Sequence, residues 1–103
     1  MTISVANVTT LGNVVYASTG NTAITYLALC NYGASNVTAN VYVIPSGQTP
    51  ANSNMLISSL NIQANDTFFL YTAAEKIILG NGDSVQATVT ANTVTSTTSY
   101  TTI

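Results

Sequence analysis

The chain has 103 residues, and only 4% of them carry a formal charge, whereas ordinary soluble domains have about 25%. The charged side chains are Asp66, Glu75, Lys76 and Asp83, and the chain contains no His. Most enzymes need an ionisable acid, base or activated nucleophile, so we expect no enzymatic activity and no catalytic residue. A hydrophobic content of 47% excludes a disordered chain, and we assign residues 1–103 to a single domain.

The same composition restricts the partners. Binding to DNA, RNA or an anionic membrane surface requires clustered Lys and Arg, and Lys76 is the only basic side chain. The apolar runs, such as residues 26–30 and 77–79, are far shorter than the ~20 residues of a membrane-spanning helix. No basic segment followed by an apolar block opens the chain, so we expect no signal peptide. Cys30, the only cysteine, is interpreted as a small buried hydrophobic residue.

Apolar and polar residues alternate with a period of two through the first half of the chain, as in half-buried strands. We predict strands at residues 3–6, 14–16, 24–30 and 37–44, with turns at 20–21 and 31–36. Both faces of the strand at 24–30 are mostly apolar, which predicts a central place in a sheet. In the strand at 37–44, one face holds Val37, Ala39, Val41 and Val43, and the other holds Tyr42 and Ile44. Pro45 ends this strand, and residues 45–54 form the longest loop.

Strand patterns continue in the second half. Residues 55–63 alternate so that one face holds Leu56, Ser58, Leu60 and Ile62. Turns at 64–66 and 80–83 flank strands at 67–71 and 77–79, with a single helical turn at 73–76. The strand at 84–91 has the clearest alternation, with its inward face formed by Val85, Ala87, Val89 and Ala91. After a turn at 92–93, the Thr- and Ser-rich segment 94–103 alternates like a strand, not like a disordered tail.

This spacing of strands determines the predicted fold class. About 7–9 short strands, spaced by about 8–12 residues, are typical of an all-β protein. We predict a small antiparallel β-sandwich of the Ig-like or jelly-roll-like kind. No segment maintains the 3.6-residue period of a helix.

All three acidic side chains lie beside predicted turns. Asp closes turns by accepting hydrogen bonds from nearby backbone N–H groups, and we predict this role for Asp66 and Asp83. A calcium site built from Asp66, Glu75 and Asp83 would supply oxygen ligands, but the spacing matches no known calcium loop. One Cys without His does not make a zinc site. We therefore expect no metal and no cofactor.

The six tyrosines are the side chains best suited to binding. They pack across strands, anchor a protein interface, or stack on sugars. A carbohydrate-binding adhesin module would need an exposed aromatic platform beside Asn or Asp. For a protein interface we select the long loop, the terminal strands and exposed tyrosines. The candidate contact residues are Tyr42, Pro45, Gln48, Pro50, Asn52, Tyr71, Tyr100 and Ile103.

The outer faces of such a sandwich would consist of Thr, Asn, Ser, Gln and Tyr with almost no charge. Charged side chains, Lys especially, normally protect exposed strand edges from pairing with other chains. We therefore expect a protein that aggregates when isolated, or one whose edges are covered by its own copies or by a larger assembly.

Five segments follow one another in a distinctive order: YLALCN at 26–31, VYVIPSG at 41–47, ANDT at 64–67, EKIIL at 75–79 and GDSVQA at 82–87. Together they resemble a group of small virion proteins of tailed phages, over nearly the whole chain. These segments are mainly strands and turns, so they specify a fold more than an activity. Asn65 stands where Gly is common in the family, which leaves the type of that turn open.

The resemblance implies a non-enzymatic structural protein of the phage particle, assembled in the host cytoplasm. Family members include head decoration (cement) proteins that bind the outer surface of the major capsid protein and stabilise the head. A tail, neck or baseplate component is the alternative. We expect the partner to be the major capsid protein or another virion protein, and the chain itself to form a homo-oligomer, either a dimer or a trimer.

Overall fold

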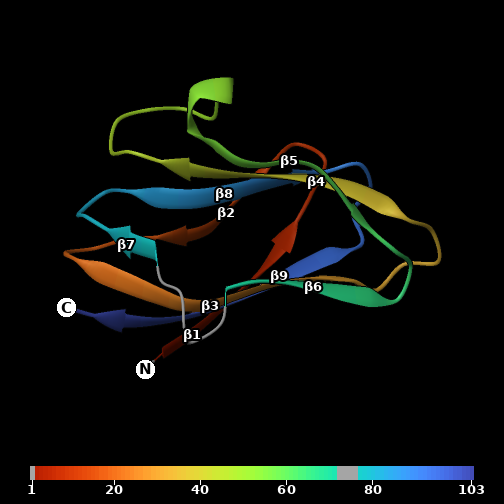
Figure 1. The fold of residues 1–103 in the computed structure, drawn as a ribbon, viewed down its shortest axis with the longest axis horizontal. Helices are drawn as coiled ribbons and strands as arrows, with labels where there is room; N and C mark the ends of the chain where they lie inside the picture. Colours follow the sequence, from red (N-terminus) through yellow and green to blue (C-terminus); the bar gives the residue numbers. More distant parts are fainter. Residues whose placement is uncertain (1, 72–76) are drawn as a thin grey trace.

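The computed structural model describes residues 2–71 and 77–103, which form two antiparallel β-sheets packed face to face (Figure 1). The strands are β1 (Thr2–Val8), β2 (Asn13–Ala17), β3 (Thr22–Asn31), β4 (Val37–Ile44), β5 (Met55–Ile62), β6 (Asp66–Tyr71), β7 (Ile77–Leu79), β8 (Ser84–Val89) and β9 (Val94–Thr102), with a 3-10 turn, η1 (Asn52–Asn54). The predicted all-β sandwich is confirmed, and every predicted strand overlaps an observed one. The helical turn predicted at 73–76 lies outside the described residues.

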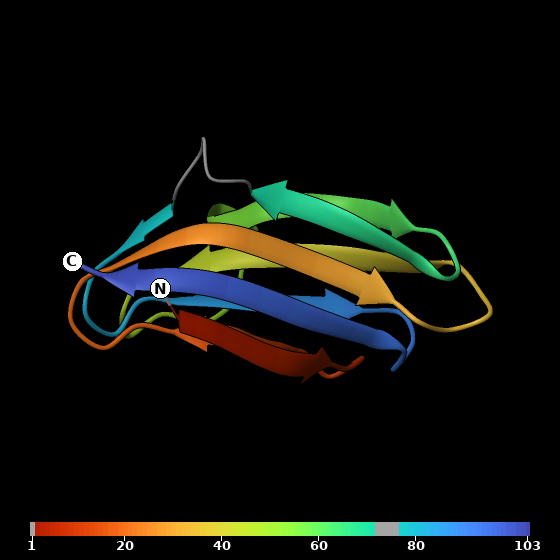
Figure 2. The same cartoon turned by 90° about the horizontal axis from the view of Figure 1, so that it is seen from below.

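Sheet A contains β1, β9, β3 and β6 in this order, and β7 pairs with the same edge of β3 as β6 does. Sheet B contains β2, β8, β4 and β5. Sheet A lies in front in Figure 2, with β1 (dark red) along one edge and β6 (teal) along the other. β3 has neighbours on both sides, which confirms its predicted central place.

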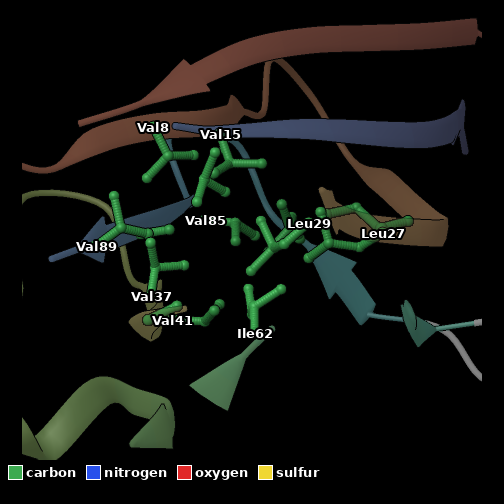
Figure 3. Close-up of a cluster of buried hydrophobic side chains, with 14 residues drawn as sticks. Val8, Val15, Leu27, Leu29, Val37, Val41, Ile62, Val85 and Val89 are labelled. Carbon is green, nitrogen blue, oxygen red and sulfur yellow. The ribbon is translucent and has the colours of Figure 1, made fainter. Parts of the chain in front are cut away.

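The hydrophobic core lies between the two sheets (Figure 3). It contains residues from both sheets, including Val8, Val15, Leu27, Leu29, Val37, Val41, Ile62, Val85 and Val89. The predicted inward face of β8 supplies Val85, Ala87 and Val89, which confirms that prediction, and the face of β4 that holds Val37, Ala39 and Val41 also points into the core. Ile44, predicted on the other face of β4, is buried as well. Because full burial of a Val, Leu or Ile side chain contributes about 1.5–3 kcal/mol, this cluster is the main source of stability.

The Thr- and Ser-rich end of the chain occupies an inner position of sheet A. β9 pairs along its length with β1 on one side and β3 on the other. Its inward side chains Val94, Ser96 and Thr98 are completely or almost completely buried. The segment is a strand as predicted, but both of its edges are covered by neighbouring strands.

The predicted face is wrong for the first part of β5. Ile57 packs against the core, whereas Leu56 is exposed. The pairing of β5 with β4 is irregular at this point, and Ser59 adopts a left-handed φ of 56°. An extra residue in a bulge reverses the alternation of faces, so Leu60 and Ile62 still point inward as predicted.

Candidate interaction surfaces

Asp83 joins three loops at the end of the sandwich where β8 begins. Its Oδ1 accepts a hydrogen bond from the backbone N–H of Ser46 at 2.9 Å, and its Oδ2 accepts one from Gly80 at 2.8 Å. Its carbonyl oxygen accepts a bond from the N–H of Ser18 at 2.9 Å. The predicted turn-closing role of this carboxylate is therefore confirmed.

Asp66 lies at the opposite end of the sandwich. It pairs with Asn31 at the end of β3, and its Oδ1 accepts a hydrogen bond from the N–H of Thr67 at 2.8 Å. Ser18, which binds Asp83, is hydrogen-bonded to Thr22 at the start of β3, and a ten-residue strand spans about 30 Å. The structure thus does not bring the two aspartates together, and Glu75 lies outside the described residues.

The described residues also contain no group of three or more His, Cys, Asp or Glu side chains that could hold a metal ion. Cys30 is half-buried on the outer side of β3, less enclosed than predicted. It lies between Thr95 of β9 and Thr67 of β6.

Asn31 is a completely buried polar side chain that connects three loops. Its Nδ2 donates hydrogen bonds to the carbonyl oxygens of Ser35 at 2.8 Å and of Ile62 and Gln63 at 3.2 Å. Its Oδ1 accepts bonds from the N–H of Gly33 at 3.0 Å and from Thr93 Oγ1 at 2.9 Å. The amide therefore satisfies backbone groups for which these loops offer no strand partner.

Four candidate contact residues share one exposed loop. They are Pro45, Gln48, Pro50 and Asn52. The loop is braced from within, because Asn54 Oδ1 accepts a bond from the N–H of Ala51 and Asn54 Nδ2 donates to the carbonyl oxygen of Thr49. Tyr42 is half-buried on β4 and pairs with Met55, the residue that follows η1. Five of the eight candidates therefore lie together at one end of sheet B.

The other three candidates lie on sheet A. Tyr100 is half-buried on β9 and packs its ring against Tyr16, with the ring centroids 4.3 Å apart. Ile103 is 62% exposed just after β9, and its N–H donates to the carbonyl oxygen of Asn21. Tyr71 ends β6, and its side chain lies outside the described part of the molecule. Tyr100 is thus mainly a packing residue, and the candidates that the structure describes are divided between the two sheets.

The outer sheet faces carry almost no charge. Asp66, the first residue of β6, is the only charged residue within the described strands. On the outer face of sheet A, Tyr26 packs against Phe69, with ring centroids 5.8 Å apart, and the neighbouring β9 positions are Thr97 and Ser99. Any contact made by these faces therefore depends on neutral polar and apolar groups.

The most concentrated exposed apolar residues were missed by the sequence analysis. Ile3 (64% exposed), Val5 (68%), Leu11 (94%) and Val14 (48%) all lie on β1, β2 or the turn between them. The smaller Ser4 and Ala6 lie opposite the buried Thr98 and Ser96 of β9. Alternation in residues 3–6 indicated a strand, but alternation alone does not tell which set of side chains faces the core.

The four outer strand edges differ in regularity. The pairing of β2 is interrupted by a bulge between Val14 and Tyr16, and that of β5 is interrupted twice. The edge opposite β1 in sheet A is divided between β6 and β7. In contrast, β1 pairs with β9 over seven consecutive residues without irregularity, and its other side pairs with no described strand. Bulges and short strands protect edges from further pairing, and β1 has neither.

None of the helical segments in the described part of the chain is long and apolar enough to cross a bilayer. Comparisons of the chain with protein-family models, with curated proteins and with solved structures find no match.

Proposed function

We propose that this chain is a non-enzymatic structural protein of a tailed-phage particle, which decorates the head by binding the outer surface of the major capsid protein. The near absence of charge on the strands is the observation that carries the proposal. A monomer that works alone in solution normally displays about 25–35% charged residues on its surface. The five segments that resemble small virion proteins are the reason for proposing a phage particle as the assembly.

The proposed mechanism is the addition of interface area. Neutral hydrogen bonds contribute about 0.5–1.5 kcal/mol each, and a standard protein interface buries about 1,600 Å² in total. Repeated over many copies on a shell, such contacts resist pressure from the packaged DNA. The loop with Pro45, Gln48, Pro50 and Asn52 is the proposed contact with the capsid, because all four residues are exposed and the loop is braced by Asn54.

The direct test uses phage particles that lack this protein. Purified heads and purified tails are incubated separately with the full chain and sedimented. We expect saturable binding to heads, with an affinity that changes less than about threefold between low and high salt, because an uncharged interface is little screened. Saturable binding to tails alone would instead assign the chain to the tail, neck or baseplate, and binding to neither would refute a virion role.

A pair of variants locates the contact. Gln48→Lys places a charge on the exposed loop after β4, and Gln63→Lys makes the same change on an exposed residue at the other end of β4. We expect Gln48→Lys to weaken head binding by about tenfold or more and Gln63→Lys to leave it unchanged. Equal effects of the two variants would reject the loop as the contact.

A further inference from the structure

We propose that the free edge of β1 is a self-association site, where the β1 strands of two copies pair antiparallel and join two A sheets into one continuous sheet. The edge of β1 offers the backbone N–H and C=O groups of every second residue to a new strand, because only its other side pairs with β9. An extended backbone segment is the ligand that such an edge accepts.

The side chains of β1 match a second copy of β1. In an antiparallel pair of strands, directly opposed residues point to the same face of the sheet. The two-fold axis must therefore lie at the level of one residue, which faces its own copy, and not between two residues. An axis at Ser4 places Ile3 of each copy directly opposite Val5 of the other. Both side chains are more than half exposed in the single chain, and directly opposed β-branched side chains stabilise a strand pair.

Electrostatics favour an identical partner over a charged one. A two-fold axis brings identical groups together, so a charged edge would repel its own copy. β1 and its neighbour β9 contain no charged residue. Lys and Glu on an edge are the usual protection against this pairing, and the edge of β1 has no such protection.

The region around the edge extends the contact. β2 lies beside β1 in the opposite sheet, and Val14 on β2 and Leu11 in the β1–β2 turn are also exposed. A copy that pairs with β1 therefore approaches apolar groups on both sheets of the sandwich. One contact would therefore cover both the unpaired backbone groups of the β1 edge and the exposed apolar side chains beside it.

Sedimentation equilibrium of the full chain and of two matched variants tests the proposal. Val5→Lys and Ile78→Lys each replace an exposed apolar strand residue, at 68% and 61% exposure, and each changes the formal net charge from −2 to −1. Val5 lies on the proposed edge, whereas Ile78 lies on β7 at the opposite edge of sheet A. We expect the wild-type chain and Ile78→Lys to form dimers, and Val5→Lys to raise the dimer dissociation constant by about tenfold or more.

Residue-resolved amide exchange of the unmodified chain gives a second readout that does not depend on any variant folding. We expect alternate amides of β1 to become protected as the protein concentration rises, while amides of β5 and β7, at edges away from β1, do not change. A wild-type chain that stays monomeric at millimolar concentration, a dimer disrupted by Ile78→Lys but not by Val5→Lys, or protection confined to another edge would each overturn the proposal. Because the isolated protein is measured, this result is independent of whether the chain binds phage heads.

Discussion

Asn31 and Thr98 lie on adjacent strands of sheet A and are both completely inaccessible to solvent, but their polar atoms meet opposite conditions. Asn31 makes five hydrogen bonds with three loops at the end of the sandwich. The Oγ1 atom of Thr98, in the middle of the sheet, has no hydrogen-bond partner among the described residues. The amide of Asn31 thus stabilises the fold, whereas the hydroxyl group of Thr98 is desolvated without gaining a hydrogen bond.

Polar residues have different roles at the loop ends and inside the sheets of this nearly uncharged chain. At the loop ends, neutral amides and one aspartate fasten the turns, because backbone groups in loops have no strand partners. In the middle of sheet A, Thr98 serves as a β-branched packing residue, and its hydroxyl group has no partner among the described residues. Polar composition therefore has two different meanings in this sequence, and substitutions at the two kinds of position separate them.

The largest effect is expected from Asn31→Ala. The substitution removes the partner of three carbonyl oxygens and two donors, of which the bond to Ile62 is buried and the other four are part-buried. A group left unsatisfied in a buried site costs about 1–3 kcal/mol. Since such terms are not additive, we expect a loss of about 3 kcal/mol or more in the free energy of unfolding. At about 4–8 °C per kcal/mol for a domain of this size, the melting temperature should fall by at least about 12 °C.

Asn36→Ala is the matched control for Asn31→Ala. Asn36 is exposed, and its Oδ1 accepts a single bond from the N–H of Ala64, which joins two of the same loops. Since water replaces this bond after the substitution, we expect a loss of less than about 1 kcal/mol. Similar losses in the two variants would show that burial of the Asn31 network has no special weight.

A smaller loss is expected from Asp83→Asn at the other end of the sandwich. The amide group keeps one acceptor but turns its NH2 group toward the N–H of Ser46 or of Gly80, which each donate to the carboxylate in the native chain. Losing one charge-assisted hydrogen bond should cost about 1–2 kcal/mol, measured by chemical denaturation. Asp66→Asn, at an exposed residue with one bond to the adjacent N–H, should change stability by less than about 0.5 kcal/mol.

The strands and most of their inward faces were predictable from the sequence, because period-two alternation reports the pleat directly. The face of Leu56 was not, because the bulge at Ser59 depends on a left-handed residue that is neither Gly nor Asn. Asn65 takes the same conformation with a φ of 59° in the turn before β6, and Asn tolerates it well. The sequence therefore contained a local signal for the turn at Asn65 but none for the bulge at Ser59.

Of the two proposed contact regions, one was predictable from the sequence and the other was not. The exposed loop after Pro45 was found from its composition, since Pro, Gly and Asn mark loops. The free edge of β1 was not found, because strand order depends on contacts far apart in the sequence. β1 is an edge strand because β9 lies between β1 and β3. Ala6 of β1 pairs with Ser96 of β9, which is 90 residues later in the chain.

The smallest effect, and the only gain, is expected from Thr98→Val. Val keeps the β-branched shape and replaces the unpartnered hydroxyl with a methyl group, so removal of the desolvation cost should raise stability by about 1 kcal/mol. The melting temperature should rise by about 4–8 °C. Ser96→Ala is the control two residues earlier on the same face, where Ser96 Oγ donates to the carbonyl oxygen of Ala6 at 3.3 Å, and it should bring no gain. If Thr98→Val lowered the melting temperature instead, the hydroxyl of Thr98 would be a stabilising group like the amide of Asn31, and the distinction between the loop ends and the sheet interior would fail.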